Sequence, residues 1–136
     1  THVVCLTECS IASLSRQEFW NLFHGYPVVA EAVVRRLSGM VRFLCNRVYE
    51  FGALDVKDRV RSEVLRLAKN AGVANDQAEI LDMPTHQEIA NRVRTHREAV
   101  TRELGELDRL GVIESERRHV VVKSISALEQ LILESK

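Results

Sequence analysis

The sequence predicts a mainly α-helical fold with a small β component: a long helix followed by a winged helix-turn-helix domain. Three observations support this. An apolar repeat of 3.5 residues runs through residues 30–51, two short helices joined by a tight turn fit residues 85–107, and two β-branched segments follow them. With 136 residues and 46% hydrophobic content, the chain can form one or two small domains with real cores.

The composition excludes several classes of protein. There are 19 basic and 19 acidic residues, so the net charge does not indicate a nucleic-acid partner. The three cysteines form no disulfide framework and predict a reduced, cytoplasmic chain with buried thiols. No apolar run approaches the ~20 residues that span a bilayer. The scattered histidines form no zinc-ligand pattern, and no nucleophile dyad or phosphate loop is present, so we expect neither an enzyme nor a metal site.

The first residues have strand character. Residues 1–6 are rich in β-branched side chains, and residues 10–14 continue this pattern. Because a strand without neighbours leaves its backbone groups unpaired, we expect the chain to be a fragment from which upstream strands are missing. Ser15 and Glu18 then form a capping-box pattern that predicts a helix over residues 16–23, and the Gly and Pro of residues 24–27 predict its end.

The next segment carries the longest regular pattern. Apolar residues are spaced alternately four and three apart over three heptads. A strict period of 3.5 is typical of a seam between two helices, whereas a helix on its own core drifts toward 3.6. A long helix packed on its own core remains the alternative, and we favour a parallel dimerisation helix. The predicted interface residues are Val34, Leu37, Val41, Leu44, Val48 and Phe51.

A second amphipathic helix is predicted from Asp55, a good N-cap, to about Asn70, with Gly72 closing it. Residues 73–77 are expected to form a polar loop, and residues 79–83 a short strand. Thr85 and Glu88 form another capping box, and they open a helix whose inward residues are Ile89, Ala90 and Val93.

Residues 94–96 form the predicted turn, and the second helix of the motif covers about residues 96–107 with Val100, Leu104 and Leu107 on its buried face. Its exposed face holds Arg97, Glu98, Thr101 and Arg102. Arginine can donate a bidentate pair to guanine O6 and N7, and glutamate can accept from cytosine N4. We therefore predict that Arg97, Glu98 and Arg102 contact DNA bases.

Two strands over residues 112–114 and 119–123 predict a wing whose tip carries Arg117 and Arg118. Ser126 is expected to cap a closing helix. Residues 85–118 contain seven arginines and seven carboxylates, so local charge does not favour DNA. A winged helix that binds another protein, with little or no DNA binding, is therefore the alternative.

Several motifs appear in one order and spacing: residues 14–19, 54–56 with Arg59, 84–90, 95–102 and 110–113. In these the sequence resembles the Crp/Fnr family of bacterial regulators, over essentially the whole chain. The resemblance implies a homodimeric transcription regulator that binds palindromic double-stranded DNA and recruits or blocks RNA polymerase. It also implies three regions: residues 1–27 as the end of a cyclic-nucleotide-binding-like sensor β-barrel, 28–53 as the dimerisation helix, and 54–136 as the winged helix-turn-helix domain, with a hinge at residues 54–56.

The resemblance further places Thr85, Gln87 and His96 near DNA phosphates. The full set of predicted phosphate contacts is Thr85, Gln87, His96, Thr101, Arg117 and Arg118. Two departures stand out. Arg94 occupies a turn position where the family often has glycine, and Leu44 with Cys45 replaces the Thr-Ser pair of cyclic-AMP-binding members. A small-molecule effector would belong to the missing sensor region, and we expect no cofactor in this part of the chain.

Overall fold

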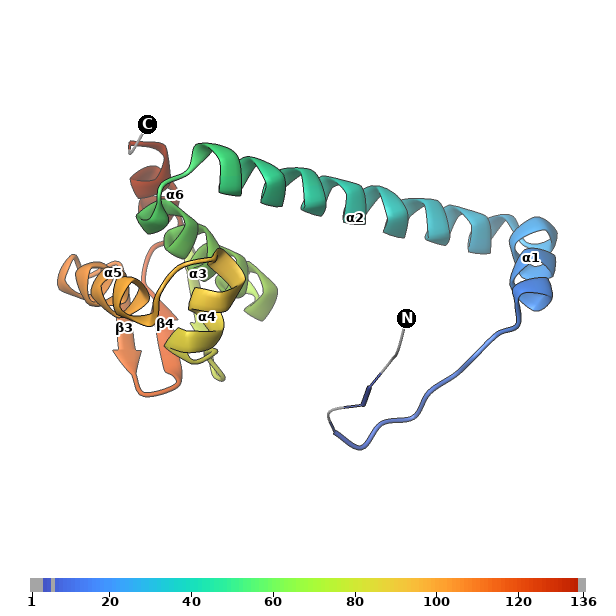
Figure 1. The fold of residues 1–136 in the computed structure, drawn as a ribbon, viewed down its shortest axis with the longest axis horizontal. Helices are drawn as coiled ribbons and strands as arrows, with labels where there is room; N and C mark the ends of the chain where they lie inside the picture. Colours follow the sequence, from blue (N-terminus) through green and yellow to red (C-terminus); the bar gives the residue numbers. More distant parts are fainter. Residues whose placement is uncertain (1–3, 6, 135–136) are drawn as a thin grey trace. The chain divides into compact units, whose positions relative to one another are not determined.

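A computed structural model describes residues 4, 5 and 7–134 (Figure 1). The chain divides into two units between Cys45 and Asn46, and each is described by itself. In chain order the elements are α1 (Arg16–Gly25), α2 (Pro27–Ala53), α3 (Val56–Ala71), β1 (Val73–Ala74), β2 (Gln77–Ile80), α4 (His86–Val93), α5 (Arg97–Arg109), β3 (Ile113–Glu116), β4 (His119–Val122) and α6 (Ile125–Leu133).

The capping box predicted for α1 is confirmed. The Ser15 backbone N–H donates to Glu18 Oε2 at 2.8 Å, and the Glu18 N–H donates to Ser15 Oγ at 3.2 Å. The helix ends at Gly25, and α2 begins at Pro27, where proline is favoured because the first helical N–H has no intrahelical partner.

Two expectations for the N-terminal unit are wrong. Residues 10–14 form no strand, because a β-branched run becomes a strand only beside a partner that completes its hydrogen bonds. The predicted strand over residues 1–6 lies mostly outside the described residues. The thiols of Cys5, Cys9 and Cys45 are exposed rather than buried.

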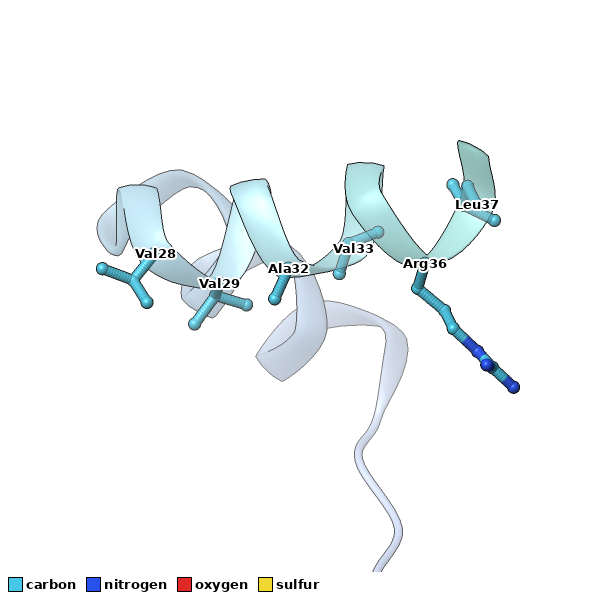
Figure 2. A pocket seen from close by; sticks show the side chains of 6 residues that line it. All are labelled: Val28, Val29, Ala32, Val33, Arg36 and Leu37. Carbon is cyan, nitrogen blue, oxygen red and sulfur yellow. The ribbon is translucent and has the colours of Figure 1, made fainter. Parts of the chain in front are cut away.

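Helix α2 is continuous over the predicted segment, and none of its residues is buried. The exposed fractions of Val34, Val41 and Val48 are 56%, 59% and 73%. Near its N-terminal end, α2 presents a shallow apolar surface formed by Val28, Val29, Ala32, Val33, Arg36 and Leu37 (Figure 2). Within the part of the chain that the structure describes, no helix is long and apolar enough to cross a membrane.

The second unit contains one antiparallel sheet with the strand order β1-β2-β4-β3. Strand β4 pairs with β2, so that Ile80 lies opposite Val120, and β4 also pairs with β3 in the predicted wing. The wing is confirmed, with Glu116 opposite His119 and a two-residue connection between them.

The polar loop predicted for residues 73–77 is wrong, because these residues form the β1–β2 hairpin. Its tip is Asn75-Asp76, with φ values of 51° and 63°. Positive φ at both central residues gives the turn type that matches the twist of hairpin strands, and Asn and Asp tolerate it better than most residues. Gly72, with φ 106°, ends α3 as predicted.

Helix α3 is the centre of the core, packing against α4, α5, α6 and β2. The inward residues predicted for the two helix-turn-helix helices are all buried. The core comprises Val60, Val64, Ala68, Ala78, Ile80, Met83, Ile89, Ala90, Val93, Val100, Leu104, Leu107, Val112, Ile113, Val120, Val122, Ile125 and Leu128.

A buried ion pair ties α5 to this core. Arg61 Nε of α3 donates to Glu103 Oε1 of α5 at 2.6 Å, and Arg61 Nη1 donates to the Leu131 carbonyl of α6 at 3.0 Å. The carboxylate of Asp58 lies 3.5 Å from the same guanidinium. Arg61 therefore serves two buried carboxylates and joins three helices.

The N-cap of α6 is Ser124 rather than the predicted Ser126, since Ser124 Oγ accepts from the Ala127 N–H. Ser126 instead donates its hydroxyl and backbone N–H to Asp76, at 2.7 and 2.9 Å. The bond from the Ser126 hydroxyl, then that from the Ser124 hydroxyl and that from the Ser126 N–H, lower the pKa of Asp76. The β1–β2 hairpin tip is thereby attached to the start of α6.

Candidate nucleic-acid interface

Helix α4 begins with the predicted capping box. Thr85 N–H donates to Glu88 Oε2 at 2.7 Å, and the Glu88 N–H donates to Thr85 Oγ1 at 3.3 Å. The pKa of Glu88 is lowered first by the hydrogen bond from the Thr85 backbone and then by that from its hydroxyl. Arg118 and Arg92 make smaller contributions in the same direction. Ala90 is fully buried, as expected where two helices approach closely. The start of the motif therefore follows from local sequence.

The turn between α4 and α5 contains the residue that departs from the family pattern. Arg94 adopts the left-handed conformation, with φ 52° and ψ 61°. A left-handed non-glycine residue costs about 1–2 kcal/mol. The turn thus keeps the geometry that a glycine would give it. The Arg94 guanidinium lies over the Phe51 ring, 4.9 Å from the ring centroid.

The exposed face of α5 carries the three predicted base-reading side chains. Arg97, Glu98 and Arg102 are all exposed. Among the described residues, none of these three side chains makes a hydrogen bond or an ion pair. They are free to bind a ligand without breaking an existing contact.

The other arginines of this unit are almost all engaged. Arg61 pairs with Glu103 and Asp58, Arg66 and Arg92 with Glu63, and Arg109 with Glu106. Arg59 donates to two backbone carbonyls, and Arg118 pairs with Asp82. In the described part of this unit, three arginines have neither a hydrogen bond, an ion pair nor a ring contact: Arg97, Arg102 and Arg117. Although the sequence has equal numbers of basic and acidic residues, the unpaired guanidinium groups of this unit lie on α5 and at the wing tip.

The predicted phosphate-contacting residues differ in how free they are. Thr85 is engaged in its capping box, and Gln87 Nε2 donates to Asn91 Oδ1 at 3.0 Å. His96 is exposed and makes no side-chain capping bond at the start of α5. Of the predicted phosphate-contacting residues Thr85, Gln87 and His96, it is His96 whose side chain has no described hydrogen bond.

Thr101 belongs to a short hydrogen-bonded chain. Its hydroxyl donates to the Arg97 carbonyl at 3.0 Å and lies 2.8 Å from His86 Nδ1. Sequence reasoning did not select His86, because nothing in the spacing of residues 86 and 101 indicates that their side chains meet. The pair links the first turn of α4 to the exposed side of α5.

The wing tip separates its two arginines. Arg117 has φ 54° and an exposed side chain without a described partner. Arg118 forms an ion pair with Asp82 at 2.6 Å and donates to the Met83 carbonyl at 3.4 Å. Arg117 is therefore the freer cation at this tip.

Comparison with known proteins identifies the motif. The Crp-like helix-turn-helix domain family matches residues 58–131. A CRP-like cAMP-activated global transcriptional regulator of Mycobacterium tuberculosis is 27% identical over 124 residues, which are 90% of this chain and 55% of that protein. The chain thus spans about half the length of the curated relatives it matches.

Solved structures share the fold. FixK2 from Bradyrhizobium japonicum matches with a TM-score of 0.73 at 21% identity, covering 87% of this chain and 59% of that chain. A CRP/FNR-family regulator from Thermus thermophilus, TTHA1359, matches with a TM-score of 0.65 at 23% identity, covering 81% and 57%. The family is not enzymatic. By its helix-turn-helix domain, the chain belongs to the Crp/Fnr family of transcription regulators.

Proposed function

We propose that the chain binds a palindromic double-stranded DNA site as a homodimer and regulates transcription together with RNA polymerase. The observation that carries this proposal is the set of unpaired side chains on α5, Arg97, Glu98 and Arg102. In a domain where nearly every other arginine has an internal partner, these are the groups that a ligand can reach without an energetic penalty for breaking an ion pair.

Recognition would proceed through α5 in the major groove. The guanidinium groups of Arg97 and Arg102 each match guanine O6 and N7, and the Glu98 carboxylate accepts from cytosine N4. Arg97 and Glu98 are adjacent, and Arg102 follows them by about 1.4 and 1.1 helical turns, so the three side chains would face neighbouring base pairs.

The DNA backbone would be held by residues around this helix. His96 and Arg117 are exposed and unpaired, and we expect them to contribute most to phosphate binding. Thr85, Gln87, Thr101 and Arg118 keep their place in the proposed phosphate set, but each must share or exchange an intramolecular hydrogen bond to act there.

Helix α2 would supply the dimer. Its 3.5-residue repeat and the exposure of its apolar side chains support a two-helix seam. The seam residues are Val34, Leu37, Val41, Leu44, Val48 and Phe51. We propose residues 28–53 as the dimerisation region and residues 54–136 as the DNA-binding region, with half-sites about 34 Å apart.

Selection of binding sites from random duplexes, followed by titration of the selected site, tests this function. We expect Arg102→Ala to weaken binding by roughly 1–3 kcal/mol and to relax the preference at one base pair of each half-site. Arg109→Ala is the matched control, since Arg109 lies on the same helix but pairs with Glu106 at 2.6 Å.

An unchanged base preference in Arg102→Ala would contradict the role of this residue. Affinity for the selected site must also fall steeply with salt, because phosphate contacts release counterions. A wild-type chain that selects no sequence and shows a flat salt dependence would instead favour a winged helix that binds protein.

A further inference from the structure

The last two turns of α2 contact the helix-turn-helix motif through a set of side chains that we call the clasp: Phe51 and Arg47 of α2, with Arg92 and Arg94 at the end of α4. The Phe51 ring lies under two guanidinium groups, 4.7 Å from Arg47 and 4.9 Å from Arg94. Arg47 also donates to the Arg92 carbonyl. All four residues belong to the second unit.

The clasp contacts the turn that precedes the recognition helix. Arg92 is held through its carbonyl, and Arg94 through its side chain. The residue between them, Val93, has its carbonyl held by Arg59 Nε at 3.1 Å. Three successive residues, the last two of α4 and the first of the turn, are thus fixed by the end of α2 and the start of α3.

A buried carboxylate supports the clasp. Glu63 of α3, whose side chain is 3% exposed, lies 2.8 Å from Arg66, 3.3 Å from Arg92 and 3.7 Å from Arg47. Glu50 of α2 lies 2.9 Å from the same Arg47. Guanidinium groups from α2, α3 and α4 thus converge on one buried carboxylate, and these ion pairs join the three helices.

The conformation of Arg94 gives a second, independent argument. A left-handed arginine is strained, and glycine would adopt φ 52° without that cost. Such strain persists only where the surroundings fix the residue. Here the surroundings are the Phe51 ring, whose face attracts a guanidinium at this distance. The contact of the Arg94 side chain with the Phe51 ring therefore accounts for an arginine at this strained position.

We propose that the clasp residues Phe51, Arg47, Arg92 and Arg94 are positioning residues, which set the orientation of α5 relative to the end of α2. Residues 54–56, where the family resemblance implies a hinge, are then held rather than free, in keeping with the burial of Leu54. This inference rests on the proposed function, because orientation matters when two recognition helices must reach both half-sites together.

Binding to two half-sites gains affinity only when both helices can engage at once. Loss of the clasp should therefore reduce binding to the palindrome and leave binding to a single half-site unchanged. A change that simply damaged α5 would weaken both. The ratio of the two affinities separates positioning from local structure.

The test is Arg94→Gly in the full chain, with Arg47→Gln as a second variant. Arg94→Gly removes the ring contact but relieves the backbone strain, so the variant should fold at least as stably as the wild type. Asn75→Gly is the matched control, because it introduces a glycine at nearly the same φ, 51°, in the β1–β2 hairpin, away from the clasp. We expect the palindrome-to-half-site ratio to fall about tenfold in Arg94→Gly, and not in Asn75→Gly.

Hydrogen exchange of the amides of residues 47–53 gives a readout that does not need DNA. We expect about tenfold faster exchange there in Arg94→Gly, because the end of α2 opens more easily once the clasp is gone. Unchanged exchange would overturn the clasp. A wild type that does not prefer the palindrome would overturn the proposed function instead, and a preserved ratio in a variant with fast exchange would overturn the positioning role.

Discussion

At the scale of single residues, the chemistry of the interface depends on which charged groups lack partners rather than on how many there are. Residues 85–118 contain as many arginines as carboxylates. Yet Glu103, Glu106 and Glu114 are paired with Arg61, Arg109 and Lys123. Internal ion pairs thus engage three of the seven carboxylates that the composition counts against DNA binding.

The wing tip offers a direct comparison of a free and a paired arginine. We expect Arg117→Ala to lower the salt slope of DNA binding by about one and to weaken all sequences equally, because a phosphate contact is lost. Alanine at φ 54° is about as strained as arginine, so the backbone should not relax. The measurement is the affinity for the selected site across a salt series.

Arg118→Ala is the matched control, since Arg118 already pairs with Asp82 at 2.6 Å. Its loss should change stability by no more than about 1 kcal/mol and alter the salt slope less. If Arg118→Ala had the larger effect on the slope, the assignment of Arg117 as the main wing contact would be wrong.

At the scale of elements, Arg61 determines how firmly α5 is held. Replacing Arg61 with Met leaves two buried carboxylates, Asp58 and Glu103, without their guanidinium partner. The change should destabilise the domain by roughly 3–5 kcal/mol. Replacing Glu103 with Gln leaves Arg61 beside Asp58 and the Leu131 carbonyl, so its cost should be smaller, about 1–3 kcal/mol. Urea unfolding of both variants measures the difference.

Equal destabilisation by the two changes would contradict the idea that Arg61 serves both carboxylates. The double variant Arg61→Met with Glu103→Leu is informative as well. It still leaves Asp58 without its guanidinium, so it should remain less stable than the wild type.

Elements were predictable where the signal was local. The capping boxes of Ser15 and Thr85 and the buried faces of α4 and α5 depend on residues within a few positions of one another. The strand predicted over residues 79–83 shares only Glu79 and Ile80 with β2, and β1 and the hairpin turn were missed. These strands are short, and their stability comes from β4, forty or more residues away. Ser124 was overlooked as a cap because Ser126 fits the same pattern, and the choice depends on Asp76 from the distant hairpin.

The interface was predictable in part for the same reason. Spacing on α5 identified Arg97, Glu98 and Arg102 as exposed, which the structure confirms. Two contacts join residues that are distant in sequence: Arg118 pairs with Asp82, and Phe51 contacts Arg94. The lack of a described partner for Arg117 likewise depends on the fold around the wing tip. No periodicity carries such information, and a heptad pattern assigned Phe51 to the dimer seam without revealing its partners within the chain.

At the scale of the whole molecule, the two units differ in what stabilises them. The second unit has a core around α3, formed by buried apolar side chains from its helices and strands. The described residues of α1 and α2 include none that is buried, and Val34, Leu37, Val41 and Leu44 are each more than half exposed. A helix with its apolar face in water is marginal, so α2 requires a partner surface.

We therefore expect the full chain to unfold in two steps. The transition of α2 should depend on protein concentration, because a dimer seam gains about 1.4 kcal/mol for each tenfold rise in concentration, whereas the transition of the second unit should not. Far-ultraviolet circular dichroism, recorded during heating over a hundredfold range of concentration, tests this.

Leu44→Asp places a charge in the proposed seam and should abolish the concentration-dependent step, while Arg42→Asp, off the repeat, should preserve it. A concentration-dependent step that survives Leu44→Asp would place the interface elsewhere, and a single step independent of concentration would contradict dimerisation through α2.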